Sequence, residues 1–275
     1  MDIATLAGII LGLGAVLVGF TLEGGSLLML LNIPAAIVVF GGTFGATCVS
    51  FPWPTVVRLP KAILKTLFPN PLDMTKAQGV LIELSRKAKQ GGTLSLENEL
   101  AGLEDPFLRQ GLRMVVDGKE ANTIGEVLEV AEAQIEERHE GLFRALEAMG
   151  GFAPTMGILG AVLALIQTMS KLDEPSEMGH SIALAFVATV YGVASANLLW
   201  IPLANKLKAR NQEELRVRRM TMVGILAIRK ADGPYAVEEK LRSYLARSVG
   251  ELDVEIVPTP AAPSETEKED MKDAA

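Results

Sequence analysis

Hydrophobic residues gather in two long blocks of the chain, and charged residues gather between and after them. Residues 3–51 and 148–203 carry little charge, whereas residues 52–147 and 204–275 are rich in charged side chains. About 20 apolar residues in a helix cross a hydrocarbon core of about 30 Å. Four uncharged stretches meet that length, at about residues 3–20, 26–51, 149–169 and 182–203. This pattern predicts an all-α membrane protein with four transmembrane helices.

The charged segments also have helical patterns. Residues 123–147, rich in Glu and Ala, run into the third span without a proline, and residues 206–229 leave the fourth span in the same way. We therefore expect long helices that extend from the membrane into a cytoplasmic helical domain. Shorter helices are predicted at 75–90, 94–103, 105–116 and 237–247. Residues 56–68 mix apolar and basic positions, which suits a helix lying along the membrane surface.

These segments divide the chain into five parts. Residues 1–51 form the first two transmembrane helices, 52–147 a cytoplasmic helical loop, 148–203 the last two transmembrane helices and 204–256 the C-terminal cytoplasmic helices. Residues 257–275 are rich in Pro, Ala and charge, which predicts a disordered acidic tail.

The distribution of basic residues predicts the orientation. Of the 26 Lys and Arg residues, 12 lie between positions 52 and 147 and 13 follow position 203. Lys171 alone lies between the last two spans, and the loop between the first two has none. Basic residues near span ends favour the cytoplasmic side. Both termini and the large loop are therefore predicted to be cytoplasmic.

Composition argues against an ordinary soluble enzyme. The 275 residues are 49% hydrophobic and 21% charged, with a net charge of −7, and the mean hydropathy is +0.30. The one cysteine and the two distant histidines give no disulfide framework and no metal centre. No cluster of catalytic residues stands out. We expect no enzymatic activity, no cofactor, no metal and no nucleic-acid partner.

The four spans contain no Asp, Glu, Lys or Arg. Machines that couple to protons or ions need an ionisable or coordinating group inside the membrane, so a partner must supply the acid or the chain is a passive scaffold. Thr155 and Thr189 are polar positions within the spans, where hydroxyl residues often serve helix contacts. Pro154 and Pro202, near span ends, have two interpretations. They are a helix start and a helix stop or kink, or they are hinges between membrane and cytosolic segments.

The sequence contains several distinctive motifs, namely Asn32-Ile33-Pro34, Gly41-Gly42-Thr43, KQGGTLSLE at 89–97, Asp105-Pro106-Phe107 through Val116-Asp117-Gly118, GGFAPTMGILGAVL at 150–163, ATVYG at 188–192, IPLANKL at 201–207 and GPYAVEEKLRSYL at 233–245. Together they resemble the MotA-type flagellar stator subunits, and the resemblance covers the chain except its tail. The resemblance implies a multi-pass protein of the bacterial inner membrane. It implies a ring, a pentamer, around a pair of MotB-type subunits whose transmembrane helix carries the ion-accepting Asp. Ion passage there would turn the ring, and the cytosolic loop would push on the rotor protein FliG.

The resemblance also implies roles for single residues. Pro154 and Pro202 match the two prolines that couple ion flux to movement. Lys89 and Glu97 match the basic and acidic residues that contact the rotor. Relatives often have Arg at the basic position, so the neighbouring Arg86 and Lys87 are candidates to share that role.

The resemblance further bears on the ion. Thr155 lies beside Pro154 in the expected ion pathway. Sodium-driven relatives carry a Thr where this chain has Ala161 and another where it has Thr189. Asn32 lies where some of them have Asp. A proton needs only a titratable site, so the loss of one hydroxyl at Ala161 predicts a proton-driven motor.

Two alternatives compete with a stator subunit. An ExbB- or TolQ-type subunit of an energy-transducing proton channel is a related ring, but such proteins usually have three spans. A four-span solute transporter would belong to a different class. It would be expected to show inverted repeats and a charged site within the membrane, and this sequence has neither.

Overall fold

The computed structural model describes residues 3–68, 73–170 and 175–249, and every regular element in these ranges is a helix. Four helical stretches are long and apolar enough to cross a membrane, which confirms the predicted count. The predicted tail at 257–275 and Lys171 lie outside the described residues. The spanning stretches are Ala4–Leu22, Leu27–Ser50, Ala121–Met169 and Ser181–Arg229.

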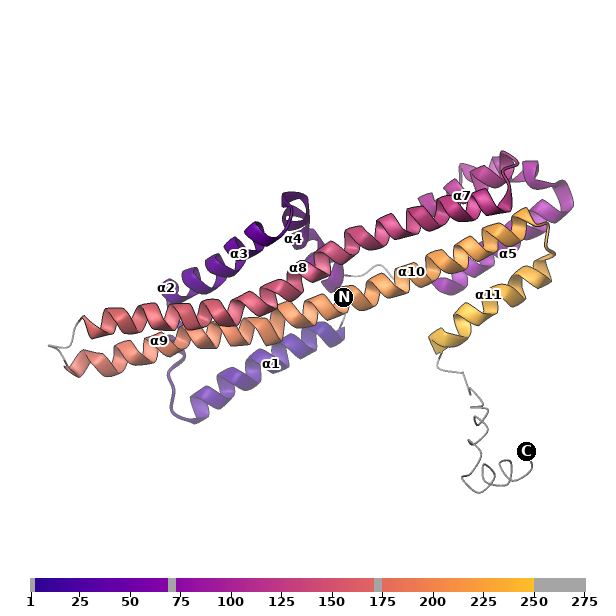
Figure 1. The fold of residues 1–275 in the computed structure, drawn as a ribbon. Coiled ribbons are helices and arrows are strands. Elements are labelled where there is room, and N and C mark those ends of the chain that lie inside the picture. The colour runs from indigo at the N-terminus through magenta and orange to yellow at the C-terminus, as the bar shows by residue number, and fades with distance from the viewer. Residues whose placement is uncertain (1–2, 69–72, 171–174, 250–275) are drawn as a thin grey trace, which may run out of the picture.

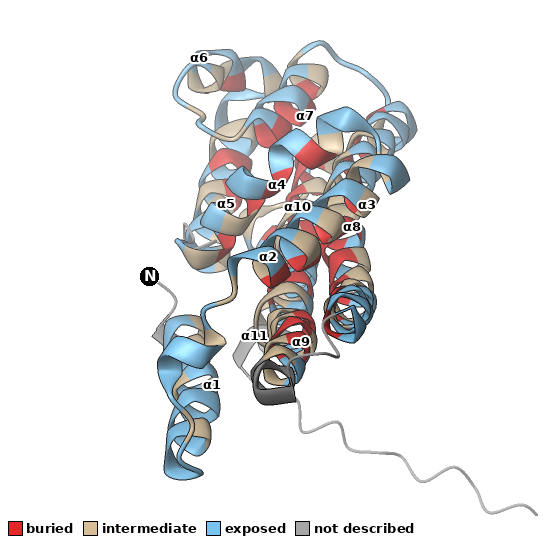
Figure 2. Ribbon diagram, turned by 90° about the vertical axis from the view of Figure 1, so that its left-hand side faces the viewer, coloured by how far each residue is buried: buried red, intermediate tan, exposed pale blue. Residues whose placement is uncertain are grey.

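The first two spans differ in regularity. Helix α1 (Ile3–Leu22) is unbroken, and Figure 2 shows it standing beside the rest of the chain with no buried residue. The second span consists of a 3-10 turn (Leu27–Leu30), α2 (Ile33–Ala36), a π-helical segment (Ile37–Gly41) and α3 (Gly42–Ser50). The break before α2 follows from its sequence, because Asn32 caps the helix and Pro34 occupies its first turn.

Two long antiparallel rods form the axis of the molecule (Figure 1). One is α8 (Ala121–Met169), a continuous helix of 49 residues. The other joins α9 (Pro175–Ser195), a π-helical segment (Ala196–Trp200) and α10 (Ile201–Arg229). The predicted extension of both spans beyond the membrane is confirmed. Each rod thereby links a membrane segment to the distant helical domain.

The interpretation of Pro154 as a helix start is wrong, because α8 continues through it. A membrane helix tolerates an internal proline when a neighbouring helix packs against the disturbed turn, and α9 does so here. Pro202 does not stop its helix either. It lies in the first turn of α10, directly after the π-helical segment. The wider turns of that segment accommodate the backbone hydrogen bond that Pro202 cannot donate.

The end of the rods away from the spans carries a helical domain (Figure 1). It contains α5 (Met74–Gly91), a 3-10 turn (Thr93–Leu96), α6 (Glu97–Leu100), α7 (Pro106–Val116) and α11 (Pro234–Val249). The helix predicted over 94–103 is confirmed in part, because the chain forms the 3-10 turn and then α6, and α6 ends at Leu100. Gly92 turns the chain before this segment with φ +77°, and the Ser95 hydroxyl hydrogen-bonds to the backbone carbonyls of Lys87 and Gly92. The fully buried core residues include Leu81, Leu112, Leu128, Ile225 and Leu241.

Helix α4 (Trp53–Leu67) lies between the two regions and crosses the rods (Figure 1). Its Leu59 packs in a small apolar core with Leu146 and Met149 of α8 and Leu203 of α10. This core surrounds the junction, where the membrane segments pass into their helical extensions. The chain therefore has two apolar cores outside the span contacts, one at the junction and one in the distal domain.

Candidate functional site

Glycines bring α8 and α9 into backbone contact around Pro154. A Cβ added at Gly192 would lie 2.5 Å from the Ala153 carbonyl oxygen and 3.1 Å from the Pro154 Cα. A Cβ added at Gly157 would lie 3.2 Å from the Thr189 Cα. Only glycine allows such an approach, which is the usual means of close helix packing in membranes. The crossing thus places Pro154 directly against the turn that carries Thr189.

The structure brings some of the predicted ion-pathway residues together and separates others. Ala161 is half-buried and lies two turns along α8 from Pro154. Thr155 lies on the exposed side, and its hydroxyl donates to the Phe152 carbonyl at 2.7 Å. Pro202 follows Ile201, whose side chain would clash with a Cβ at Gly150, one turn of α8 before Pro154. The two prolines therefore lie on neighbouring rods and are about one helical turn apart along the rod axis.

A group of hydrogen bonds between the start of the second span and α9 was not predicted. The Tyr191 hydroxyl donates to the Leu30 carbonyl and accepts from the Asn32 backbone N–H at 3.2 Å. The Asn32 side-chain amide donates to the Leu184 carbonyl at 3.2 Å. These bonds satisfy the broken backbone before α2 and tie the second span to α9. Tyr191 and Asn32, two polar residues within apolar spans, were the only signals in the sequence.

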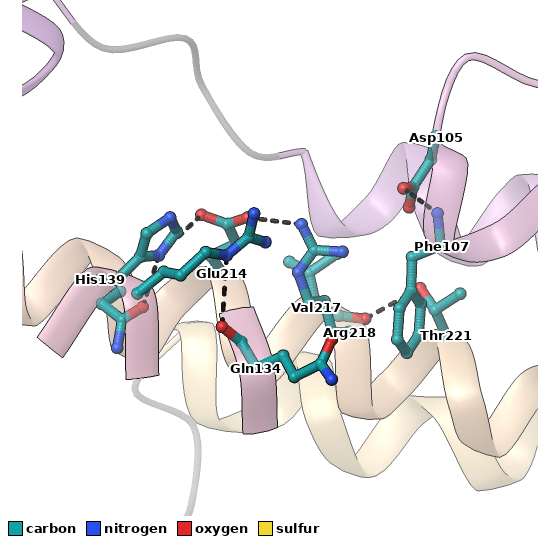
Figure 3. A network of polar contacts seen from close by, with 10 residues as sticks. Asp105, Phe107, Gln134, His139, Glu214, Val217, Arg218 and Thr221 are labelled. Carbon is teal, nitrogen blue, oxygen red and sulfur yellow. Dashed lines mark hydrogen bonds and ion pairs between the residues drawn. The ribbon is translucent and has the colours of Figure 1, made fainter. Parts of the chain in front are cut away.

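A network of polar side chains joins α8 and α10 beyond the junction (Figure 3). The His139 Nδ1 lies 2.8 Å from the Asn211 Oδ1 and 3.8 Å from a Glu214 carboxylate oxygen. Glu214 accepts from Arg218 at 2.6 Å. Burial acts to raise the pKa of Glu214, but the hydrogen bond and charge of Arg218, with smaller effects of His139 and Lys65, hold it below its usual value.

The same network reaches the distal domain. The Arg218 guanidinium lies over the Phe107 ring, 5.3 Å from its centroid, and Asp105 caps α7 by accepting from the Phe107 N–H at 2.9 Å (Figure 3). On the next position of α10, Arg219 donates to Glu132 of α8 at 2.6 Å, and this bond raises the pKa of Arg219. The rods are therefore joined by charged groups along the part that extends beyond the spans.

The acidic residue predicted to contact the rotor lies beside a groove. Glu97 of α6 lines a cavity of about 390 Å³ together with Arg109, Arg113 and Asp117 of α7. Glu97 and both arginines are exposed. Arg109 and Arg113 were missed at the sequence level, although their spacing of four places them on one face of a helix.

The three basic candidates on α5 differ in their surroundings. Lys87 donates to Glu99 at 2.8 Å and lies 3.4 Å from Glu83, and the hydrogen bond to Glu99 raises the pKa of Lys87. Lys89 donates to the Ala231 carbonyl at 3.0 Å, across the turn between α10 and α11. Arg86 is exposed, and no hydrogen bond or ion pair joins it to another described residue. Lys87 and Lys89 are thus held within the chain, whereas Arg86 is available to a partner.

The described residues contain no group of three or more His, Cys, Asp or Glu side chains placed to hold a metal ion. The polar groups of the two regions instead suit transmission between helices and contact with a charged surface.

Comparison with known sequences gives two family matches. The MotA/TolQ/ExbB proton channel family matches residues 99–220, and the N-terminal region of motility protein A matches residues 6–92. Motility protein A of Bacillus subtilis is 35% identical over 247 residues, which cover 89% of this chain and 91% of that protein. The chemotaxis protein PomA of Vibrio alginolyticus is 30% identical over 258 residues, covering 93% of this chain and all of the relative.

Comparison with solved structures agrees. The C. jejuni MotAB structure superposes with a TM-score of 0.85 at 30% identity, over 89% of this chain and 96% of that one. The flagellar MotAB stator complex from Bacillus subtilis gives a TM-score of 0.81 at 34% identity, over 88% and 95% of the two chains. Both the sequence and the fold are therefore similar to stator proteins over nearly their whole length.

Proposed function

This chain belongs to the motility protein A group of the MotA/TolQ/ExbB proton channel family and is a flagellar motor stator subunit of the inner membrane, and we propose how its residues serve that role. Several copies, five by family resemblance, form a ring around a MotB-type partner. The partner supplies the transmembrane Asp that these spans lack. Both termini and the large loop face the cytoplasm, where the distal domain pushes on the rotor protein FliG.

The continuity of the rods is the observation that carries this proposal. Helix α8 runs unbroken from the close crossing at Pro154 to the distal domain, and α10 runs beside it from Pro202. Movement at the prolines, caused by charge changes on the partner's Asp, is therefore passed to the distal domain without an intervening flexible loop. The charged bonds between α8 and α10 keep the two helices moving together.

We further propose that protons drive the motor. Ala161 offers no hydroxyl oxygen at a position where sodium-driven relatives carry a Thr, so one potential oxygen ligand is missing. Sodium requires a shell of several oxygen ligands, whereas a proton requires only the partner's carboxylate. Swimming that persists with a proton uncoupler and stops without sodium would contradict this assignment.

For the rotor contact, we propose Arg86 and Glu97 as the residues that meet the charges of FliG directly. Lys87 and Lys89 hold the shape of the contact surface through Glu99 and Ala231. Arg109 and Arg113 set the local charge around Glu97. Exposed charges of this kind steer and register an encounter more than they add affinity.

Charge reversals in a strain that lacks the wild-type gene test this division. R86E and E97K should each reduce swimming while the protein stays in the membrane at normal amount, and opposite reversals on FliG should restore part of the swimming. K76E is a matched control, because Lys76 is exposed on the same helix α5 but in its first turn. Equal swimming of R86E and K76E would refute the role of Arg86.

The same strain tests the function as a whole. Loss of the gene should leave full-length but paralysed flagella. Normal swimming in a strain without a second stator gene would favour the ExbB- or TolQ-type alternative, and defects in outer-membrane uptake would then be expected.

A further inference from the structure

Helix α4 carries three different faces. Its buried face, with Val56, Leu59, Ala62 and Thr66, packs on α8 and α10. At about 3.6 residues per turn, a second stripe contains exposed apolar side chains and a third, adjoining stripe contains basic ones. The exposed apolar residues are Trp53, Val57, Leu64 and Phe68, each more than half exposed, and the basic residues are Arg58, Lys61 and Lys65.

The outer stripes lie at the level of the membrane boundary. The second span ends at Ser50, and α4 begins at Trp53. Figure 1 shows α4 running across the rods at the place where the spans pass into their extensions. An apolar stripe next to a basic stripe, with a tryptophan at one end, is the arrangement of helices that lie in the interface between lipid and water.

The charges of α4 have few partners within the chain. The helix contains no acidic residue. Lys65 lies near enough to Glu214 to lower that residue's pKa, so part of its charge is compensated. Arg58 and Lys61 are exposed, and no ion pair or hydrogen bond joins either one to another described residue. Two uncompensated cations therefore stand beside apolar side chains at the membrane boundary.

We infer that Arg58 and Lys61 bind the headgroups of anionic phospholipids while Trp53, Val57, Leu64 and Phe68 enter the acyl region. The occupant is lipid because the stripe continues directly from a membrane span and because its charge is complementary to acidic headgroups. The buried face of α4 contacts the junction core beside Pro202, so the bound lipids fix one side of the junction against which the rods move.

Trp53 provides a direct measurement. The chain has two tryptophans, so W200F leaves Trp53 as its single tryptophan, and any tryptophan of the partner is replaced by phenylalanine. The full chain with its partner is reconstituted in phosphatidylcholine vesicles that contain the same mole fraction of either brominated phosphatidylglycerol or brominated phosphatidylcholine. Two cations near the surface enrich an adjacent anionic lipid by roughly tenfold or more. Brominated phosphatidylglycerol should therefore quench Trp53 at least about twofold more strongly.

Charge variants separate the inference from general membrane attraction. R58Q/K61Q should make the two brominated lipids quench equally. K119Q/K230Q removes the same number of charges from exposed positions of the distal domain and should keep the preference for phosphatidylglycerol. Phosphatidylglycerol retained by the purified wild-type complex, measured by mass spectrometry, should fall in R58Q/K61Q and so supports the result without W200F. Equal quenching in the parent protein, or no quenching by either lipid because a second copy covers α4, would overturn the inference.

Discussion

Alanine at Gly192 tests whether close contact between α8 and α9 underlies the function of Pro154. The added Cβ would lie 2.5 Å from the Ala153 carbonyl oxygen and 3.1 Å from the Pro154 Cα. Both neighbours are backbone atoms, which cannot rotate away as a side chain does. Carbon atoms pack best at about 3.5–4.0 Å, so the helices must separate by up to about 1 Å.

The cost follows from this separation. A gap of about 0.5–1 Å forfeits a quarter to a half of the dispersion energy across the contact, and overpacking of this kind costs about 1–3 kcal/mol. The general preference of helices for Ala over Gly returns about 0.5–1 kcal/mol. We therefore expect G192A to lower stability by about 1–2 kcal/mol. For a chain of this size that corresponds to roughly 2–8 °C in unfolding temperature.

The assay heats membranes in steps, solubilises them and measures the surviving oligomer by size-exclusion chromatography, with swimming scored in parallel. G151A is the matched control. Gly151 lies on the exposed side of α8, and its added Cβ would meet nothing within 4 Å. G151A should leave the unfolding temperature unchanged or slightly raised. If G192A matched G151A in both unfolding temperature and swimming, the close crossing would not position Pro154.

Three further substitutions test the distal domain and the helical extensions, all in the same heating assay. A231G should raise the unfolding temperature by a few degrees, because Ala231 has φ +58° and that conformation costs L-residues about 1–2 kcal/mol; no increase would contradict the strain. R219M should lower stability by about 1–2 kcal/mol, because it leaves the buried Glu132 carboxylate without its partner, and full stability of this variant would show that the pair contributes nothing. Arg218 keeps the pKa of Glu214 below its ordinary value in the folded chain, so this carboxylate stabilises the fold at neutral pH and loses its contribution as the pH falls through its pKa. E214Q should therefore reduce the drop in unfolding temperature between neutral and acidic pH, and an unchanged drop would refute this.

Most of the fold follows from the sequence because hydrophobic periodicity and span length decide where helices run. The continuity of α8 through residues 123–147 was predicted for that reason. The π-helical segments at Ile37–Gly41 and Ala196–Trp200 were not, because one extra residue in a helical turn barely changes an apolar pattern. Pro154 shows the same limit, since a helix start and an internal proline look alike until the neighbouring helix is known.

The sequence identified candidate site residues only where the residue type and its motif were enough to single them out. The two prolines and Glu97 stood out by their chemistry and their resemblance to a family. The difference between Arg86, Lys87 and Lys89 did not, because it depends on partners elsewhere in the chain. Glu99 lies 12 residues from Lys87, and Ala231 lies 142 residues from Lys89. Only the folded arrangement shows that Lys87 and Lys89 have partners within the chain and that Arg86 has none among the described residues.

In the proposed mechanism, the length of α8 converts a small tilt at Pro154 into a large displacement of the distal end of the helix. From Ala121 to Pro154 the helix rises about 50 Å at about 1.5 Å per residue. A tilt of roughly 5° at Pro154 therefore displaces the far end by about 4 Å, which is enough to make or break an ion pair. Such a lever works only if α8 and α10 do not slide past each other, and the bonds of Arg219 to Glu132 and of His139 to Asn211 oppose sliding. Under the proposed mechanism, the glycine contact at the crossing and the polar contacts along the rods are therefore both required, because together they make a stiff lever that tilts at Pro154.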